Sequence, residues 1–306
     1  MSIKSRLKRL IKDKETRAQI MQKLSFIDDV SMIKILYWIN TGKTCNLDNP
    51  RTFNEKIQWY KLYYRKPIMT KLADKIAVKR FVSDAGYPEI VTPVYAEWKD
   101  PGSIRFEDLP SPCILKCNHN SDGAIIWTAD RIDEAETIRG RIRRMLQNNQ
   151  FWGSREWCYK DIEPLVFAEE LLQPKNGELI DWNVFCFNGV PKLVLCNKGL
   201  ITASGEHSGK AARAAFLPDF TPVEIESGMD PIPIDEIQKP QFYNEMLEVA
   251  SRLAVSFPQV RVDFFQIDDN YRFGEMTFYS SSGYSEWKPE EWQYRMGDWF
   301  HLPNKS

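Results

Sequence analysis

The chain has 306 residues, of which 43% are hydrophobic and 27% charged, and its formal net charge is −1. These proportions are typical of a globular protein and exclude a disordered or collagen-like chain. The near-zero net charge argues against nucleic acid as a partner. No apolar run approaches the roughly 18 residues that a membrane-spanning helix needs.

The cysteines and histidines bound the chemistry further. The six cysteines form no C-x-x-C pair, and the three histidines are widely spaced, which argues against a zinc site. Free thiols are typical of a reducing compartment, so the sequence predicts a cytoplasmic protein.

The N-terminal segment is strongly basic. The first 25 residues hold eight Lys or Arg and two Asp or Glu. For residues 1–14 this composition predicts one of two arrangements. The segment is either a helix that lies on the anionic inner surface of a membrane, or a helix docked on the protein with one solvated side. The second is the more frequent arrangement.

The next part of the chain reads as helical. Residues 53–64 and 72–86 have helical periodicity, and the second segment stops at Gly86, before Pro88. Proline-bearing loops follow up to residue 112.

From Cys113 onward, hairpins alternate with single helices, which is typical of an α+β fold. In chain order, the predicted elements are a hairpin of 113–117 and 125–127, a helix over 133–149, a strand over 164–172, a hairpin of 181–187 and 190–196 around Asn188–Gly189, a poorly patterned stretch over 199–237, a helix over 239–257, and a hairpin of 260–267 and 271–278.

Lys116 lies inside the apolar run CILKC and is followed by a polar turn that includes Asn120 to Gly123. A buried cation is costly unless it meets an anion, so one interpretation is a phosphate-binding lysine beside a phosphate-binding loop. The alternative is a lysine on the exposed face of a hairpin, and for Lys116 alone that is the more frequent case.

Arg261 and Asp263 share one face of their strand, because strand side chains alternate, and Glu275 and Thr277 share a face of the next. Pairing of the two strands brings Asp263 near Glu275. Mg²⁺ prefers one or two carboxylates together with substrate phosphates, so the pattern predicts a metal site. The alternative is a pair of charges on the wet face of a sheet, which periodicity alone favours.

A further acidic pair, Glu169–Glu170, closes the apolar strand PLVFAEELL and could accept hydrogen bonds from ribose hydroxyls or an amine. The order of these features along the chain resembles the ATP-grasp fold. The segments FNEKIQWYKL, LADKIAVKRFV, ILKCNH, REWCYKDIEP, AEELL, FCFNG, VRVDFF and FGEMTF together resemble the TupA-like ATP-grasp family over roughly residues 50–302.

The resemblance implies an α+β ATP-grasp fold that holds a nucleotide between two subdomains. The implied units are a helical extension over 1–50, an N-terminal part over 51–112, a small ATP-binding subdomain over 113–173 and a C-terminal subdomain with the metal site over 174–306.

The resemblance also implies roles for individual residues, with ATP and Mg²⁺ as cofactors. The implied roles are Lys75 and Lys116 on phosphates, Glu169, Glu170 and Leu172 in a hinge at adenine, Asp181 at ribose, Arg261 as a stabiliser of the transferred phosphate, and Asp263, Glu275 and Thr277 as metal ligands. Thr277 stands where ATP-grasp enzymes commonly have Asn, and Asn183 stands where the family is expected to have Lys.

The activity implied is an ATP-dependent carboxylate–amine ligase. It would join an amine or amino acid to a carboxylate of a surface polysaccharide or its precursor through an acyl phosphate. His119 either assists proton transfer or hydrogen-bonds the turn, and we favour the second.

Three other functions stay open. A glycosyltransferase would want a D-x-D metal motif, which the chain lacks. A glycan kinase would share the ATP site. A non-catalytic polysaccharide-binding member could use the aromatic residues near the C-terminus, such as Trp287 and Trp292, which are otherwise core residues.

Overall fold

The computed structural model describes residues 14–121, 123–175, 179–200 and 211–305. The predicted basic segment 1–14 lies outside the described residues except for its last residue. The chain then continues through helices α2 (Lys14–Lys23), α3 (Asp29–Thr41), α4 (Phe53–Tyr63), α5 (Pro67–Ala73) and α6 (Ala77–Asp84).

The single helix predicted over 72–86 is wrong, because α5 ends at Ala73 and α6 begins at Ala77. The Asp74 carboxylate accepts hydrogen bonds from the amides of Ile76 and Ala77, at 2.8 and 3.1 Å, and so caps the second helix. The break frees the Lys75 amide to donate to the Asn118 carbonyl at 3.1 Å.

A four-stranded antiparallel sheet follows, with strand order β1-β4-β2-β3. Its strands are β1 (Val94–Trp98), β2 (Cys113–Cys117), β3 (Ile125–Trp127) and β4 (Val166–Glu170). The predicted β2–β3 hairpin is confirmed. Helix α7 (Ala135–Gln147) packs Ile138 and Ile142 against one face of this sheet, and the short helix α8 (Gln150–Ser154) follows.

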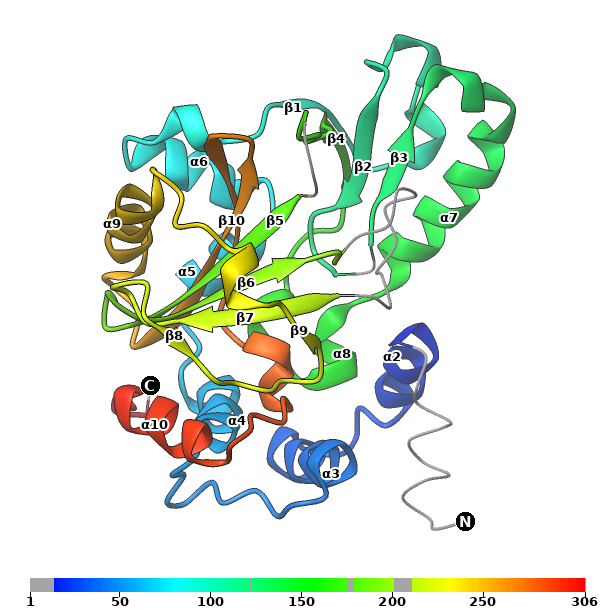
Figure 1. Ribbon diagram of the computed structural model, residues 1–306. Helices are drawn as coiled ribbons and strands as arrows, with labels where there is room; N and C mark the ends of the chain where they lie inside the picture. The colour runs from blue at the N-terminus through cyan, green and yellow to red at the C-terminus, as the bar shows by residue number, and fades with distance from the viewer. Residues whose placement is uncertain (1–13, 122, 176–178, 201–210, 306) are drawn as a thin grey trace.

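The second sheet is larger and lies across the centre of Figure 1, with strand order β11-β10-β5-β6-β7-β8 and β9 paired to β7. Its strands are β5 (Ile180–Phe187), β6 (Val190–Lys198), β7 (Ala212–Phe216), β8 (Pro222–Val223), β9 (Asp230–Pro231), β10 (Gln259–Ile267) and β11 (Asn270–Thr277). Both predicted hairpins are confirmed. Asn188 and Gly189 both have positive φ, 51° and 76°, as their tight turn requires.

The two faces of the large sheet are covered differently. Helix α9 (Tyr243–Ala254) packs its apolar side on what we call the back face, where Trp182 lies 5.8 Å from the Tyr243 ring. On the front face, α4 places Phe53 6.1 Å from both Phe185 and Phe187. Only part of the front face is apolar, and its remainder forms the candidate site.

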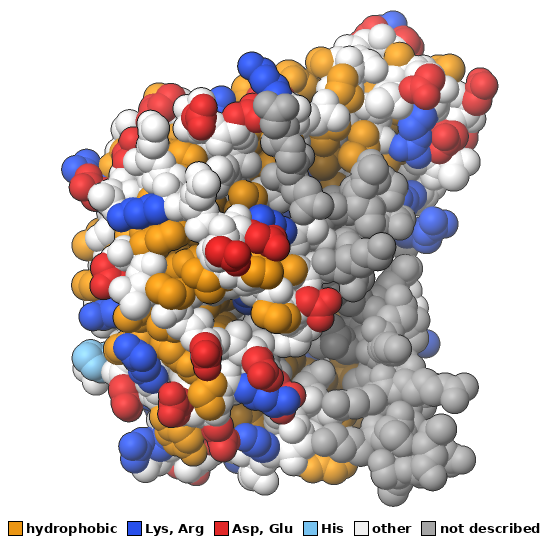
Figure 2. All heavy atoms as spheres, in the orientation of Figure 1, with side chains coloured by type: hydrophobic (Ala, Val, Ile, Leu, Met, Phe, Trp, Pro, Cys, Tyr) orange, Lys and Arg blue, Asp and Glu red, His pale blue; other side chains and the backbone are white. Residues whose placement is uncertain are grey.

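The architecture is the predicted α+β. In Figure 1 the small sheet and α7 stand above and to the right of the large sheet, while α3, α4 and α10 (Glu291–Trp299) lie below it. Trp287 and Trp292 near the C-terminus are buried and belong to the core. Figure 2 shows both signs of charge interspersed over the drawn face. In the described ranges, no helix has the length and apolar character to cross a membrane.

Candidate active site

A row of polar side chains, the polar strip, crosses five neighbouring strands on the front face of the large sheet. Cross-strand register places its members side by side: Arg261 pairs with Thr277, and Asp263 pairs with Asn183. The strip consists of Thr277, Glu275, Arg261, Asp263, Asn183, Asp181, Asn197 and Arg213. The back-face neighbours of these residues, such as Val262 and Trp182, are buried in the core.

Arg261 is the centre of the strip, and its guanidinium contacts all three predicted metal ligands. Its Nε donates to Asp263 Oδ1 at 2.6 Å, and its Nη2 donates to Thr277 Oγ1 at 3.1 Å and lies 3.6 Å from Glu275 Oε1. Thr277 Oγ1 in turn donates to Glu275 Oε1 at 2.9 Å. The structure therefore brings these four residues together, as the strand alternation predicted.

Burial and neighbouring charges act differently on the two carboxylates. Burial, with a contribution from Glu275, raises the pKa of Asp263 to about 6 although Arg261 opposes the shift. Burial also disfavours the charge of Glu275, but Lys75 and Arg261 hold its pKa below the usual range. A further cation at this end of the strip would lower the pKa of Asp263.

The donor set fits Mg²⁺. Asp263, Glu275 and Thr277 offer two carboxylates and one hydroxyl, which are the hard oxygen ligands that this ion prefers. Across the residues that the structure describes, no three Asp, Glu, His or Cys side chains form a group able to hold a metal alone.

Lys75 connects the polar strip to the loop after β2. Its Nζ donates to the Asn120 carbonyl at 3.0 Å and lies 3.6 Å from Glu275 Oε2. One predicted phosphate-binding lysine thus bridges the predicted phosphate loop and a predicted metal ligand. Residue 122 of that loop lies outside the described residues.

The second predicted lysine belongs to a buried ionic cluster on the small sheet, which we call the lysine clamp. Lys116 Nζ lies 2.6 Å from Glu169 Oε1, and Lys79 Nζ lies 2.8 Å from Glu169 Oε2. Lys79, on α6, also donates to the Thr92 carbonyl at 3.0 Å. The side chain of Glu169 is only 6% exposed, so two cations share one buried carboxylate.

The clamp governs the ionisation of its members. Burial disfavours the charge of Glu169, but Lys116 and Lys79 together hold its pKa below the usual range. Burial lowers the pKa of Lys79, and Glu169 limits that shift. Lys79 was not predicted as part of the site, because a lysine in an amphipathic helix is expected at the surface.

The predicted hinge follows the clamp. The Glu170 amide donates to the Pro93 carbonyl at 3.1 Å, and half-buried Leu172 lies just beyond the end of β4. The Lys175 amide donates to Asp268 Oδ1 at 3.0 Å, which ties the connection between the sheets to the β10–β11 turn.

His119 is fully buried, with Nδ1 3.3 Å from Asn118 Oδ1. Burial, reinforced by the charge of Lys75, lowers its pKa to about 4. Its burial and the contact with Asn118 favour the interpretation in which His119 hydrogen-bonds the turn, and the catalytic interpretation stays a prediction.

The far end of the strip joins Asp181 and Asn183, which were named from the sequence, to Asn197 and Arg213, which were not predicted. Asn183 Nδ2 donates to Asp181 Oδ1 at 2.7 Å, and Asn197 Nδ2 donates to Asn183 Oδ1 at 2.7 Å. Arg213 Nε donates to Asn197 Oδ1 at 2.6 Å. Burial, with the charge of Asp263, raises the pKa of Asp181 well above its usual value. The sequence signal that could have identified Asn197 and Arg213 is a polar residue that directly follows an apolar one in each of the strands β6 and β7.

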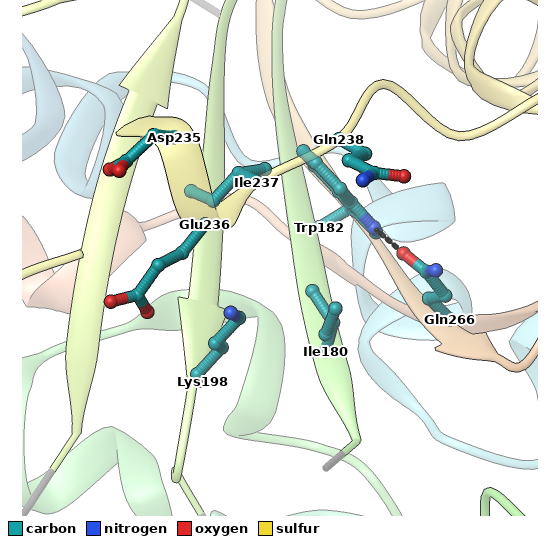
Figure 3. Close-up of a pocket in the computed structure, with 8 residues that line it drawn as sticks. All are labelled: Ile180, Trp182, Lys198, Asp235, Glu236, Ile237, Gln238 and Gln266. Atoms are coloured by element: carbon teal, nitrogen blue, oxygen red, sulfur yellow. Dashed lines mark hydrogen bonds between the residues drawn. The ribbon is translucent and has the colours of Figure 1, made fainter. Parts of the chain in front are cut away.

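A separate groove of about 540 Å³ lies on the back face (Figure 3). Ile180 and Trp182 line it, and these residues alternate along β5 with Asp181 of the strip. Trp182 Nε1 donates to Gln266 Oε1 at 2.9 Å across its wall. The sheet therefore separates this groove from the polar strip.

A model of the TupA-like ATP-grasp family matches residues 55–301. The chain belongs to the TupA-like ATP-grasp family. This membership establishes the predicted ATP-grasp fold, and the helices and two β-sheets are those of the predicted α+β class. No curated protein matches the chain.

Solved structures of ATP-grasp ligases are similar at low identity. The ligase PsnB complexed with minimal precursor, Mg and ADP has 17% identity and a TM-score of 0.39, covering 74% of this chain and 57% of its own. D-alanine–D-alanine ligase from Bacillus anthracis complexed with ATP has 13% identity and a TM-score of 0.39, covering 68% and 56%. D-cycloserine synthetase DcsG has 14% identity and a TM-score of 0.42, covering 76% and 71%. The chain spans just over half the length of the PsnB and D-alanine ligase chains.

Proposed function

We propose that this family member is a carboxylate–amine ligase that uses MgATP. The observation that carries the proposal is the junction at Glu275, where Lys75 from one unit and Arg261 from the other both lie 3.6 Å from the same carboxylate. Two cations and two carboxylates at one point suit a phosphate chain and its Mg²⁺, because each charge finds an opposite partner.

The reaction has two steps. A carboxylate oxygen of the acid substrate attacks the γ-phosphorus of ATP, the bond to the β,γ-bridging oxygen breaks, and ADP leaves. The amine then attacks the carbonyl carbon of the acyl phosphate, loses a proton and expels inorganic phosphate. No enzyme nucleophile is required, and the protein contributes positioning and charge neutralisation.

Each cluster has a role in this scheme. Lys75 and Lys116 bind phosphate oxygens, and Arg261 stabilises the phosphoryl group in transfer. Asp263 and Glu275, with Thr277, would hold Mg²⁺, which neutralises the developing charge on the phosphates when bound.

The nucleoside would occupy the junction between the sheets. Backbone groups of Glu169 to Leu172 would meet adenine, and Asp181 would accept a hydrogen bond from ribose. The small unit over 113–173 would hold ATP against the unit over 174–306, with β1 completing its sheet.

We propose a sugar-linked or polysaccharide carboxylate as the acid and an amine or amino acid as its partner, in the cytoplasm. The resemblance supports this choice, since the family occurs in surface-polysaccharide gene clusters.

Hydroxylamine trapping tests the reaction. The protein is incubated with MgATP, hydroxylamine and a panel of uronates, and ADP and hydroxamate are measured together. The proposal expects equal amounts of both with at least one uronate. Phosphorylated sugar without hydroxamate would indicate a glycan kinase instead. Stabilisation by Mg-UDP-sugars without any ATP response would favour a glycosyltransferase, and no response to either nucleotide would favour a binding role.

A further inference from the structure

Arg213 is a half-buried cation at the far end of the polar strip. It lies on β7, opposite Asn197 of β6, and its side chain is directed along the front face. Burial lowers its pKa to about 10, with the charge of Arg261 contributing. A guanidinium at such a position ordinarily has a carboxylate partner.

The partners that Arg213 has are neutral. Its Nε donates to Asn197 Oδ1 at 2.6 Å, and its Nη1 donates to Ser227 Oγ at 2.6 Å. In the described part of the chain no carboxylate lies within ion-pair distance of it, and its Nη2 has no hydrogen-bond partner. Two neutral contacts orient the guanidinium, while Asp181 and Asp263 act on its charge only from beyond ion-pair distance.

The orientation is itself fixed by a chain of hydrogen bonds. Asn197 Nδ2 donates to Asn183 Oδ1 at 2.7 Å and to the Asp181 carbonyl at 3.2 Å. The amide of Asn197 is thus held by β5 with its oxygen aimed at Arg213. This is the arrangement of a preorganised binding group rather than of a flexible surface arginine.

We propose that Arg213, oriented by Asn197 and Ser227, is an oxyanion-binding residue of the active site. Its ligand is a carboxylate of the acid substrate or the γ-phosphoryl group of the nucleotide, since both present two anionic oxygens that a guanidinium fork can bind together. The inference rests on the proposed ligase function and adds to it the residue that receives the second anionic group.

The location supports this role. The strip places Asp181 and Asn183 between Arg213 and the Arg261 cluster, so an anion at Arg213 lies on the same front face as the predicted metal ligands. Both arginines face one side of one sheet, while the residues alternating with Arg213 on β7, such as Ala214, face the core.

The experiment uses calorimetry and thermal unfolding on four full-length proteins: the natural chain, Arg213→Met, Arg213→Lys and the control Arg252→Met, which alters an exposed arginine of α9. Affinities for MgADP and for the MgATP analogue MgAMPPNP are measured by calorimetry. The unfolding midpoint of the MgADP complex is measured with sodium glucuronate against glucose at equal ionic strength.

If the γ-phosphoryl group is the ligand, Arg213→Met weakens MgAMPPNP about tenfold while MgADP changes little. If the carboxylate is the ligand, both nucleotide affinities persist and the stabilisation by glucuronate is lost. In either case we expect Arg213→Lys to retain part of the lost binding and Arg252→Met to match the natural chain.

The proposal is overturned if Arg213→Met matches the natural chain in both arms, because Arg213 would then be merely structural. Failure of the ligase proposal would look different, because the natural chain itself would then bind neither nucleotide. The glucuronate arm would still report on Arg213 in that case, with nucleotide-free protein.

Discussion

The two ionic clusters of this protein are built in opposite ways. In the lysine clamp of the small sheet, two ammonium groups share one carboxylate, so the cluster has an excess positive charge. In the Arg261 cluster of the large sheet, one guanidinium is shared by two carboxylates, and Lys75, 3.6 Å from Glu275, balances the second negative charge. The proposed MgATP would suit both clusters, because its phosphate oxygens can meet the ammonium groups and its metal ion can meet the carboxylates.

The largest loss of activity is expected from a substitution in the Arg261 cluster. Glu275→Ala removes the carboxylate that Lys75 and Arg261 share, and with it a predicted Mg²⁺ ligand. We expect MgATP turnover to fall by at least about 100-fold, because the removed group acts on the developing charge. Turnover is measured as ADP release, with circular dichroism to check the fold. The exposed acid Glu286 supplies the control variant Glu286→Ala, and unchanged turnover in Glu275→Ala would remove Glu275 from the site.

A substitution in the lysine clamp should lower the stability of the fold. Lys79→Met leaves buried Glu169 with Lys116 alone, and we expect the free energy of unfolding to fall by about 3 kcal/mol, since an incompletely compensated buried charge is costly. Urea unfolding measures this change. Lys99→Met breaks the exposed pair with Glu163 and should cost below about 1 kcal/mol. Equal losses in the two variants would contradict the clamp.

His119 adds a third buried group to the comparison, because the charge of Lys75, the lysine that meets Glu275, disfavours its protonation. Burial and then Lys75 lower its pKa from 6.5 to about 4 on folding. Between these pH values the unfolded chain binds more protons than the folded one, so the free energy of unfolding falls as pH falls. At 1.36 kcal/mol per pKa unit, this amounts to about 2 kcal/mol between pH 6.5 and 5.

The test is the pH dependence of urea unfolding in His119→Asn, with His301→Asn at an exposed position as its control. We expect the acid-side slope to be reduced only in His119→Asn. The same slope in that variant and in the natural chain would mean that His119 is protonated as easily in the folded protein.

The smallest effect is expected at Thr277. Thr277→Val keeps the shape but removes the hydroxyl that joins Arg261 to Glu275. One lost hydrogen bond corresponds to about tenfold weaker Mg²⁺ affinity, measured as the Mg²⁺ concentration that gives half-maximal turnover. Thr277→Asn should retain the function, since an amide oxygen can also ligate the ion. An effect of Thr277→Val as large as that of Glu275→Ala would mean that the hydroxyl is a principal ligand.

Sequence alone predicted what depends on local periodicity. Strand alternation placed Arg261 with Asp263 and Glu275 with Thr277, and the Asn188–Gly189 turn identified the β5–β6 hairpin. Both predictions follow from side chains pointing to alternate faces of a strand and from the positive φ of the turn.

What sequence alone missed depends on contacts between distant segments. Lys79 meets Glu169 only because α6 packs beside β4, and Arg213 joins the strip only because β7 pairs with β6. The helix break at Asp74 was hidden because the apolar pattern continues through it, and only the side-chain cap reveals it.

The most direct test of the account is calorimetric titration of ATP with and without Mg²⁺ into the natural chain and Glu275→Gln. We expect Mg²⁺ to tighten ATP binding to the natural chain. For Glu275→Gln we expect ATP still to bind to the lysines, with most of the Mg²⁺ effect on affinity lost. An identical Mg²⁺ effect in both proteins, or no binding of ATP to the natural chain, would contradict the account.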